Sequence, residues 1–407
     1  MRALRNVGRL LSPGSPPREN VDILLEGDLV AAVVAAGPGR EVEQEFDCAG
    51  GLLTPGLIDA HTHPLYARPR LAEVAQRAAG VSYSDVAAAG GGINATVRDT
   101  RATPLADLEA DARARLRRWL EQGTTTVEAK TGYWLTRVGE LGAVGLLARL
   151  AKDPSLPRLA VTYLAAHEVP PEHREERADY VAAVAKWCPA ARAAGASFCD
   201  VFCDEGAFTV AESELILKAG TAAGMRLRVH ADELKLSGGA LLAARLGAVS
   251  ADHLLQIGET EIQALKGSST VATLCPVTAL NIGRLPPARR LLQSGVSLAL
   301  GSDHNPGTSG TTSMSLVVYL AVTELGLSVE EALTAATIGG AHSLGVRNRG
   351  TAEPGKLADL VLWDADHEGA FAWEPGLRAT AVWRGGALQT VEPEHAGGAG
   401  PLPLGSR

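Results

Sequence analysis

The chain reads Pro55-Gly-Leu-Ile-Asp-Ala-His-Thr-His63 at the point where a short apolar run meets two histidines. Residues i and i+2 of a β-strand point the same way, so His61 and His63 can bind the same metal ion. A single His-x-His pair is weak evidence, because a histidine at a strand end is commonly a hydrogen-bonded structural residue. The evidence for a metal site becomes stronger if other metal-binding residues also follow apolar, strand-like runs.

Three further apolar runs end in residues of the same kind, namely His230 after Arg226–Val229, His253 after Ala248–Ala251 and Asp303 after Ser297–Leu300. Three histidines and one carboxylate around an open position form the usual site for a metal that activates water. The sequence therefore predicts one metal site with four protein ligands: His61, His63, His230 and Asp303.

His253 is expected to act beside this site as an acid–base group, because imidazole titrates near neutral pH and four ligands are already present. Its spacing alone leaves open whether it binds the metal itself. Asp303, bound through one oxygen, can also accept a proton from the water. The sequence thus assigns proton transfer to His253 and Asp303.

Apolar runs of strand length recur eight times in the middle of the chain, at Leu57–Ile58, Thr124–Glu128, Leu159–Ala165, Phe198–Cys203, Met225–Val229, Ala248–Ala251, Thr270–Cys275 and Ser297–Leu300. Amphipathic stretches lie between them, and residues 106–122 are the clearest predicted helix. Strands that alternate with helices form a parallel sheet, and this number predicts a closed (β/α)₈ TIM-type barrel. The predicted ligands would all lie at its catalytic, C-terminal face.

Both ends of the chain read differently from its middle. Residues 1–54 and 347–391 contain short strand-like runs separated by Gly-rich turns, which predicts one small β-sandwich domain formed from both chain ends. The barrel is expected to span residues 55–346. Residues 392–407 are rich in Gly and Pro without periodicity and are predicted to be a disordered tail.

Composition excludes several classes of partner. The net charge of −8 argues against nucleic acid, and no apolar run reaches membrane-spanning length. The five cysteines form no Cys-x-x-Cys pair and include Cys199 and Cys203, which are expected to be buried. These features, with no signal-peptide pattern, predict a cytoplasmic protein.

Longer motifs carry a resemblance to a known family. They are Pro55–His63, Ala89-Gly-Gly-Gly-Ile93, Lys130-Thr-Gly-Tyr133, His167-Glu-Val-Pro-Pro-Glu172, His230-Ala-Asp-Glu233, Ser302-Asp-His-Asn-Pro-Gly-Thr308 and Gly355-Lys-Leu-Ala-Asp359. With these motifs the chain resembles the amidohydrolase superfamily and, within it, the imidazolonepropionases. The resemblance implies metal-dependent hydrolysis of the cyclic amide of 4-imidazolone-5-propanoate to N-formimino-L-glutamate in histidine degradation.

The resemblance also implies a set of substrate-binding residues: Arg70, Tyr83, Tyr133, His167, Glu233, Asn305, Gly307 and Thr308. Arg70 matches the arginine that binds the substrate carboxylate, which a guanidinium can hold through two hydrogen bonds. Glu233 matches a catalytic residue that holds polar atoms of the ring, and could equally orient His230.

The chain departs from the family pattern at two places. Leu65-Tyr-Ala-Arg-Pro69 brings an extra arginine, Arg68, so either Arg68 or Arg70 could face the substrate. The stretch Val277–Arg284 lacks the expected aromatic residues, which could change the shape of the pocket.

The fourth predicted strand ends without a lysine to bridge two metals, so one divalent ion is expected. It is either zinc or iron, with zinc slightly favoured. Lys130, beside Glu128, reads as a solvated or paired lysine.

Two alternatives share the same ligand set. One is another amidohydrolase, such as a deaminase of a purine or pyrimidine, and the other is a non-catalytic metal-binding barrel. Only the carboxylate-binding residues separate the first alternative from the favoured reaction. Barrel enzymes of this kind are often homodimers, although no feature of the sequence fixes the oligomeric state.

Overall fold

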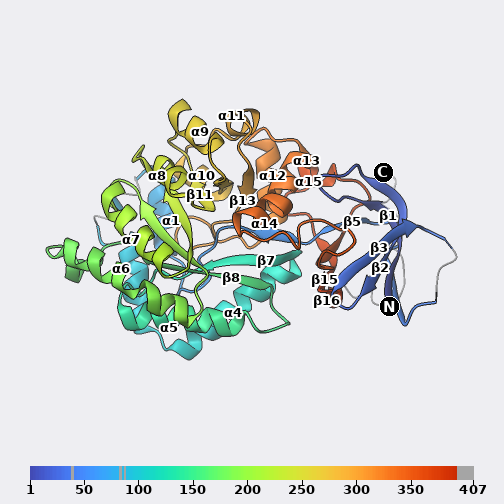
Figure 1. The fold of residues 1–407 in the computed structure, drawn as a ribbon, viewed down its shortest axis with the longest axis horizontal. Coiled ribbons are helices and arrows are strands. Elements are labelled where there is room, and N and C mark those ends of the chain that lie inside the picture. Colours follow the sequence, from blue (N-terminus) through green and yellow to red (C-terminus); the bar gives the residue numbers. More distant parts are fainter. Residues whose placement is uncertain (38–40, 82–84, 87–88, 392–407) are drawn as a thin grey trace.

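The computed structural model describes residues 1–37, 41–81, 85–86 and 89–391. Its larger part is a parallel barrel whose strand order follows the chain, and its smaller part is a separate sheet (Figure 1). The barrel strands are β6 (Leu57–Asp59), β7 (Thr124–Lys130), β8 (Arg158–Ala166), β9 (Phe198–Cys203), β10 (Arg226–Ala231), β11 (Ser250–His253), β12 (Val271–Leu274) and β13 (Leu298–Leu300). Each of the eight predicted apolar runs overlaps one of these strands, so the predicted barrel is confirmed.

The barrel closes where β6 meets the end of β13. The N–H of Ala60 donates to the carbonyl of Leu300 at 3.2 Å, and the N–H of Asp303 donates to the carbonyl of His61 at 2.9 Å. A third bond of 2.8 Å runs from the N–H of His63 to the carbonyl of His304. Closure therefore places the His-x-His segment beside Asp303.

Helices surround the barrel strands, in the order α1 (Leu71–Ala78), α3 (Gly92–Ala102), α4 (Leu105–Glu121), α5 (Arg137–Leu150), α6 (Arg177–Ala194), α7 (Val210–Ala222), α8 (Gly239–Leu246), α9 (Glu259–Lys266), α10 (Pro276–Ile282), α11 (Ala288–Gln293), α12 (Met314–Thr323), α13 (Val329–Thr334) and α14 (Gly340–Ser343). The predicted helix 106–122 corresponds to α4. Its apolar stripe, which includes Leu108 and Leu116, is buried against the barrel. In the described part of the chain, no helix combines the length and the apolar character needed to cross a membrane.

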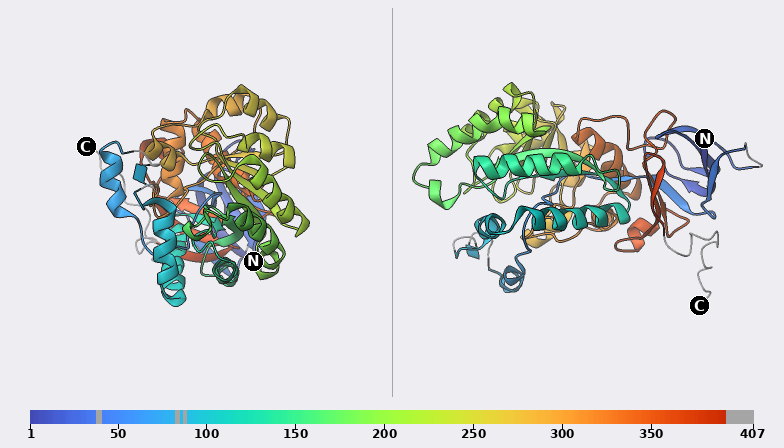
Figure 2. Two further views of the ribbon diagram at one scale, coloured as in Figure 1. Left: turned by 90° about the vertical axis from the view of Figure 1, so that its left-hand side faces the viewer. Right: turned by 90° about the horizontal axis from the view of Figure 1, so that it is seen from below.

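The two chain ends form one sheet. Its order is β16-β15-β14-β5-β1-β2-β3, and β4 also pairs with β1. The strands are β1 (Arg2–Leu10), β2 (Arg18–Glu26), β3 (Leu29–Ala35), β4 (Gln44–Asp47), β5 (Leu52–Pro55), β14 (Leu360–Trp363), β15 (Ala379–Arg384) and β16 (Ala387–Val391). Figure 2 shows the N-terminal strands and the red C-terminal strands together at one end of the molecule.

The antiparallel pairing of β5 with β14 joins the two chain ends, with Pro55 opposite Leu360. The β15–β16 hairpin turns at Gly385 and Gly386, whose φ angles of +57° and +68° suit glycine. A TIM barrel with a small β domain from both ends is therefore confirmed as the fold class. The exact domain boundaries stay a prediction, and the predicted tail lies outside the described residues.

Candidate metal centre and substrate cavity

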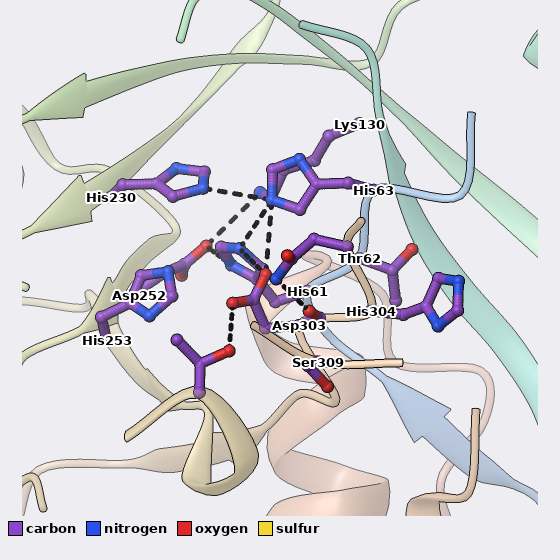
Figure 3. A network of polar contacts seen from close by, with 12 residues as sticks. His61, Thr62, His63, Lys130, His230, Asp252, His253, Asp303, His304 and Ser309 are labelled. Atoms are coloured by element: carbon purple, nitrogen blue, oxygen red, sulfur yellow. Dashed lines mark hydrogen bonds and ion pairs between the residues drawn. The ribbon is translucent and has the colours of Figure 1, made fainter. Parts of the chain in front are cut away.

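Four side-chain atoms from three strand ends converge at the C-terminal face of the barrel. Nε2 of His63 lies 3.3 Å from Nε2 of His61 and 3.4 Å from Nε2 of His230. Oδ1 of Asp303 lies 3.5 Å from Nε2 of both His61 and His63. Figure 3 shows these side chains turned toward one another.

This spacing fits a tetrahedral metal ion. Ligand atoms about 2.1 Å from such an ion lie about 3.4 Å from one another, and the four measured separations fall between 3.3 and 3.5 Å. Burial lowers the pKa of His61, His63 and His230 well below the usual value. Neutral imidazoles present nitrogen lone pairs, which a cation between them would bind.

Two buried carboxylates lie behind the histidine rings. Nδ1 of His61 donates to Oδ2 of Asp252 at 2.7 Å, which leaves Nε2 of His61 to face the metal position. Nδ1 of His230 lies 3.1 Å from Oδ2 of Asp200. Carboxylates in this position fix the orientation of a histidine ligand and increase its basicity.

A buried cation bridges these two carboxylates. Nζ of Lys130 lies 2.7 Å from Asp200, 3.0 Å from Glu128 and 3.5 Å from Asp252. Burial alone would lower the pKa of Lys130, but the negative charges of Asp200 and Glu128 outweigh burial and raise it. Arg228 adds a second buried cation, with Nη2 3.1 Å from Asp252. Lys130 is thus fully buried and paired rather than solvated.

Burial shifts the pKa values of the two predicted proton-transfer groups, Asp303 and His253, in opposite directions. Oδ2 of Asp303 accepts a hydrogen bond of 2.6 Å from the hydroxyl of Thr278, and burial raises the pKa of Asp303 to about 7. Burial lowers the pKa of His253 to about 4. Nε2 of His253 lies 3.7 Å from the carboxylate of Glu233, whose own pKa burial raises well above its usual value.

The backbone is strained at the same strand ends. Asp232, His253, Leu254 and Asp303 all have positive φ angles, of +52°, +75°, +62° and +47°. Non-glycine residues adopt this conformation rarely, and they concentrate at functional sites. The strain turns the chain sharply just where β10, β11 and β13 deliver their polar side chains.

A small cavity of about 50 Å³ opens above the metal position. Its walls include most of the predicted site residues: His63, Arg70, Tyr133, His167, His230, Glu233, His253, Asp303, Asn305 and Thr308. Ile282 and Leu234 add apolar surface. Polar groups that converge on a partly apolar cavity are typical of a small-molecule site.

The structure separates the two candidate arginines. Arg70 lines the cavity, whereas the side chain of Arg68 is 72% exposed and lies 3.4 Å from Asp99. Gly307 does not line the cavity, but a Cβ atom there would overlap Nη2 of Arg70. Tyr83 lies outside the described residues.

Local contacts position two further predicted residues, His167 and Asn305. The ring of His167 stacks on that of His63, with centroids 5.0 Å apart and an interplanar angle of 16°. The side-chain carbonyl of Asn305 accepts the N–H groups of Gly307 and Thr308 at 2.7 and 2.8 Å, which shapes the turn after β13.

Sequence reasoning missed the residues that support the site: Asp200, Asp252, Arg228, Thr278, Glu73 and Thr96. Asp252 immediately precedes His253, and Asp200 lies inside an apolar run, so each could have been noticed as a charge within a predicted strand. Their partners became apparent only in the closed barrel.

The chain is similar to characterised families over most of its length. Residues 52–389 match the model of the amidohydrolase family. The imidazolonepropionase of Shouchella clausii is 40% identical over 358 residues, which cover 85% of this chain and 80% of that protein. The imidazolonepropionase of Anaeromyxobacter sp. strain K is 43% identical over 374 residues, covering 91% of this chain and 88% of that protein.

Solved structures of low sequence identity share the fold. A triazine hydrolase variant matches with a TM-score of 0.79 at 19% identity, covering 97% of this chain and 95% of that one. An adenosine deaminase from Xanthomonas campestris with bound zinc matches with a TM-score of 0.70 at 20% identity, covering 99% of this chain and 94% of that one. From its sequence relatives, the chain belongs to the amidohydrolase family and, within it, to the imidazolonepropionases.

Proposed function

We propose that this protein hydrolyses the cyclic amide of 4-imidazolone-5-propanoate to N-formimino-L-glutamate, a step in histidine breakdown. One observation carries the proposal: three imidazole nitrogens and a carboxylate oxygen converge in a cavity that also contains an arginine. Relatives that are 37–43% identical over most of the chain bear the name of this enzyme.

The proposed cofactor is one divalent metal held by His61, His63, His230 and Asp303. When bound, such an ion supplies a water of lowered pKa, about 7, and polarises the carbonyl oxygen under attack. Zinc and iron both suit these ligands, and zinc is favoured because a structurally similar adenosine deaminase carries it. The five free, buried cysteines fit a reducing compartment such as the cytoplasm.

Proton transfer falls to Asp303 and His253. Asp303 accepts a proton from the attacking water, and its hydrogen bond from Thr278 holds the carboxylate in place for this step. His253, which burial keeps neutral, would take up that proton from Asp303 and pass it to the ring nitrogen as the amide C–N bond breaks. The hydroxyl group joins the former carbonyl carbon, so the products are a carboxylate and a free formimino nitrogen.

Substrate binding falls to residues farther up the cavity wall. Arg70 would bind the propanoate carboxylate, while Tyr133, His167 and Glu233 contact the ring and its polar atoms. Asn305 and Thr308 would meet the newly formed product carboxylate. Together these contacts would hold the ring carbonyl against the metal position.

A heterocycle deaminase would use the same ligands but would gain little from Arg70 when its substrate carries no carboxylate. Replacing Arg70 with Ala tests this difference. Loss of one charged hydrogen-bond partner should raise KM for imidazolone propanoate by about tenfold to a hundredfold. The matched control is Arg68→Ala, at an exposed arginine outside the cavity, which should leave KM unchanged.

The readout is formiminoglutamate detected by mass spectrometry, with a panel of purines and pyrimidines assayed for ammonia release. Product from imidazolone propanoate that depends on Arg70 supports the proposal. Ammonia release from a neutral base that is indifferent to Arg70→Ala would contradict it. No turnover of any substrate by metal-replete protein would favour the non-catalytic alternative.

A further inference from the structure

A single carboxylate organises the arginine in the cavity wall. Oε2 of Glu73, on α1, accepts a hydrogen bond of 2.9 Å from Nε of Arg70 and lies 3.6 Å from Nη1 of Arg77. Glu73 is 7% exposed, although it belongs to a short helix at the edge of the barrel. A carboxylate is buried in this way only when it is paired, so its partners define its position.

The other oxygen of Glu73 meets the backbone of the next segment. Oε1 accepts the N–H of Gly92 at 2.8 Å, and a Cβ atom at Gly91 would lie 2.8 Å from the same oxygen. These residues belong to the motif Ala89-Gly-Gly-Gly-Ile93. Glycine at position 91 therefore leaves room for the Glu73 carboxylate.

Arg70 has a second fixed partner and a second glycine beside it. Nη1 of Arg70 donates to the hydroxyl of Thr96 at 2.7 Å, on helix α3. Gly307 lies against Nη2 so closely that a Cβ atom would overlap it. The guanidinium plane is thus set by Glu73 on α1, by Thr96 on α3 and by the absence of a side chain at Gly307.

We propose that Glu73 is a positioning residue that sets the affinity of the enzyme for carboxylate-bearing ligands through Arg70. The inference rests on the proposed function, because it takes the substrate to carry a propanoate. A free arginine side chain has many rotamers, and fixing its planar group in advance lowers the entropy cost of two-point binding. Glu73 would thus contribute to substrate specificity without touching the substrate.

A purely structural role for Glu73 makes a different prediction. If Glu73 only stabilised α1, its loss would weaken binding of every ligand in the cavity to the same extent. If Glu73 acts through Arg70, its loss weakens the binding of only those ligands that carry a carboxylate. The ratio of the affinities for two ligands that differ only in the carboxylate therefore distinguishes these roles.

The experiment compares imidazole-4-propanoate with 4-ethylimidazole, which lacks the carboxylate, as competitive inhibitors and by calorimetry on the metal-loaded protein. The variants are Glu73→Gln and Gly307→Ala. Each should reduce the preference for the propanoate by about tenfold, while the affinity for 4-ethylimidazole and the metal content stay unchanged. KM for imidazolone propanoate should rise by the same factor, with kcat changed less than KM.

Two more variants complete the test. Glu259→Gln removes one carboxylate of an exposed pair with Arg290 and should leave the preference intact. Glu73→Asp keeps the charge but shortens its reach, so it should give an intermediate loss of preference. If Glu73→Gln lowers the affinity for both ligands by the same factor, or if neither Glu73 variant folds, the proposal is wrong and Glu73 serves the fold alone.

Turnover by the unmodified enzyme tests the proposed function separately. If the protein prefers imidazole-4-propanoate through Glu73 but does not hydrolyse imidazolone propanoate, the proposed reaction is wrong and the proposed role of Glu73 stands. If the unmodified enzyme hydrolyses imidazolone propanoate but Glu73→Gln lowers the affinity for both inhibitors equally, only the proposed role of Glu73 is wrong.

Discussion

Nε2 of His61 and Oδ1 of Asp303 lie 3.5 Å apart across the seam where the first and last barrel strands meet. The backbone makes the same connection, because the N–H of Asp303 donates to the carbonyl of His61 at 2.9 Å. Two ligands from opposite ends of the barrel sequence are therefore brought together by barrel closure itself. Metal binding and closure should stabilise each other.

Removal of the metal should lower stability. A ligand present at a hundred times its dissociation constant contributes about 2.7 kcal/mol to a protein that binds it only when folded. Treatment with a chelator should therefore lower Tm in a thermal scan, and added zinc should restore it. The variant His63→Ala should show little change on chelation, and an equal drop in that variant would contradict the assigned ligand set.

Asp303→Asn should lower kcat strongly, because the amide neither carries the negative charge of a ligand nor accepts a proton. General base catalysis alone contributes roughly a hundredfold or more. The assay is formiminoglutamate production at saturating substrate. Asp364→Asn, at an exposed aspartate paired with Arg378, is the control and should keep full activity. Activity of Asp303→Asn within a few-fold of the control would contradict its role.

Asp252→Asn should weaken metal binding while leaving every direct ligand in place. The carboxylate accepts the hydrogen bond from Nδ1 of His61 at 2.7 Å, and loss of such a partner typically costs roughly tenfold to a hundredfold in metal affinity. Competition with a coloured chelator measures the affinity, and Asp364→Asn again serves as the control. Unchanged affinity in folded Asp252→Asn would show that the ring is held by other contacts.

Lys130→Met should destabilise the protein, because it leaves three buried carboxylates without their shared cation. Breaking a buried ion pair from one side costs about 3 kcal/mol or more, and Lys130 is fully buried among Glu128, Asp200 and Asp252. Urea unfolding measures the change. Lys218→Met, in an exposed pair with Glu214, should cost less than about 1 kcal/mol. Equal losses in the two variants would contradict this account.

The ion pair between Arg177 on α6 and Glu212 on α7 should make a pH-dependent contribution to stability. A hydrogen bond from Arg177 lowers the pKa of Glu212 from the usual 4.5 to about 2. A lowered folded-state pKa gives stability that is present above pH 4.5 and is lost as pH falls toward 2. The difference in unfolding free energy between the unmodified protein and Glu212→Gln should therefore shrink from pH 7 to pH 3. A constant difference would show that the charge of Glu212 is not responsible.

Much of the barrel could be predicted because apolar runs, turns and ligands recur in a regular order. Even β6 and β13, each only three residues long, were predicted because polar residues typical of strand ends follow them. The first strand of the small sheet lacks a regular strand pattern in the sequence for a physical reason. β1 carries a bulge between Leu4 and Val7, and Asn6 has a φ of +52°, so the alternation of buried and exposed residues is broken.

The charges beneath the metal position could not be paired from sequence. Lys130, Asp200 and Asp252 lie on β7, β9 and β11, which are the second, fourth and sixth barrel strands. Side chains from alternate strands share one layer inside such a barrel, so residues far apart in sequence become neighbours only after closure. A single strand shows a charge among apolar residues and does not show its partner.

The central claim is that the converging histidines and Asp303 hold a metal that the proposed hydrolysis requires. Its most direct test is the turnover of freshly generated imidazolone propanoate by metal-replete, chelated and zinc-restored protein. We predict formiminoglutamate well above the spontaneous rate, its loss on chelation, and its return with about one zinc ion per chain. Turnover that persists after complete chelation, or metal-replete protein that forms no product, would contradict the claim.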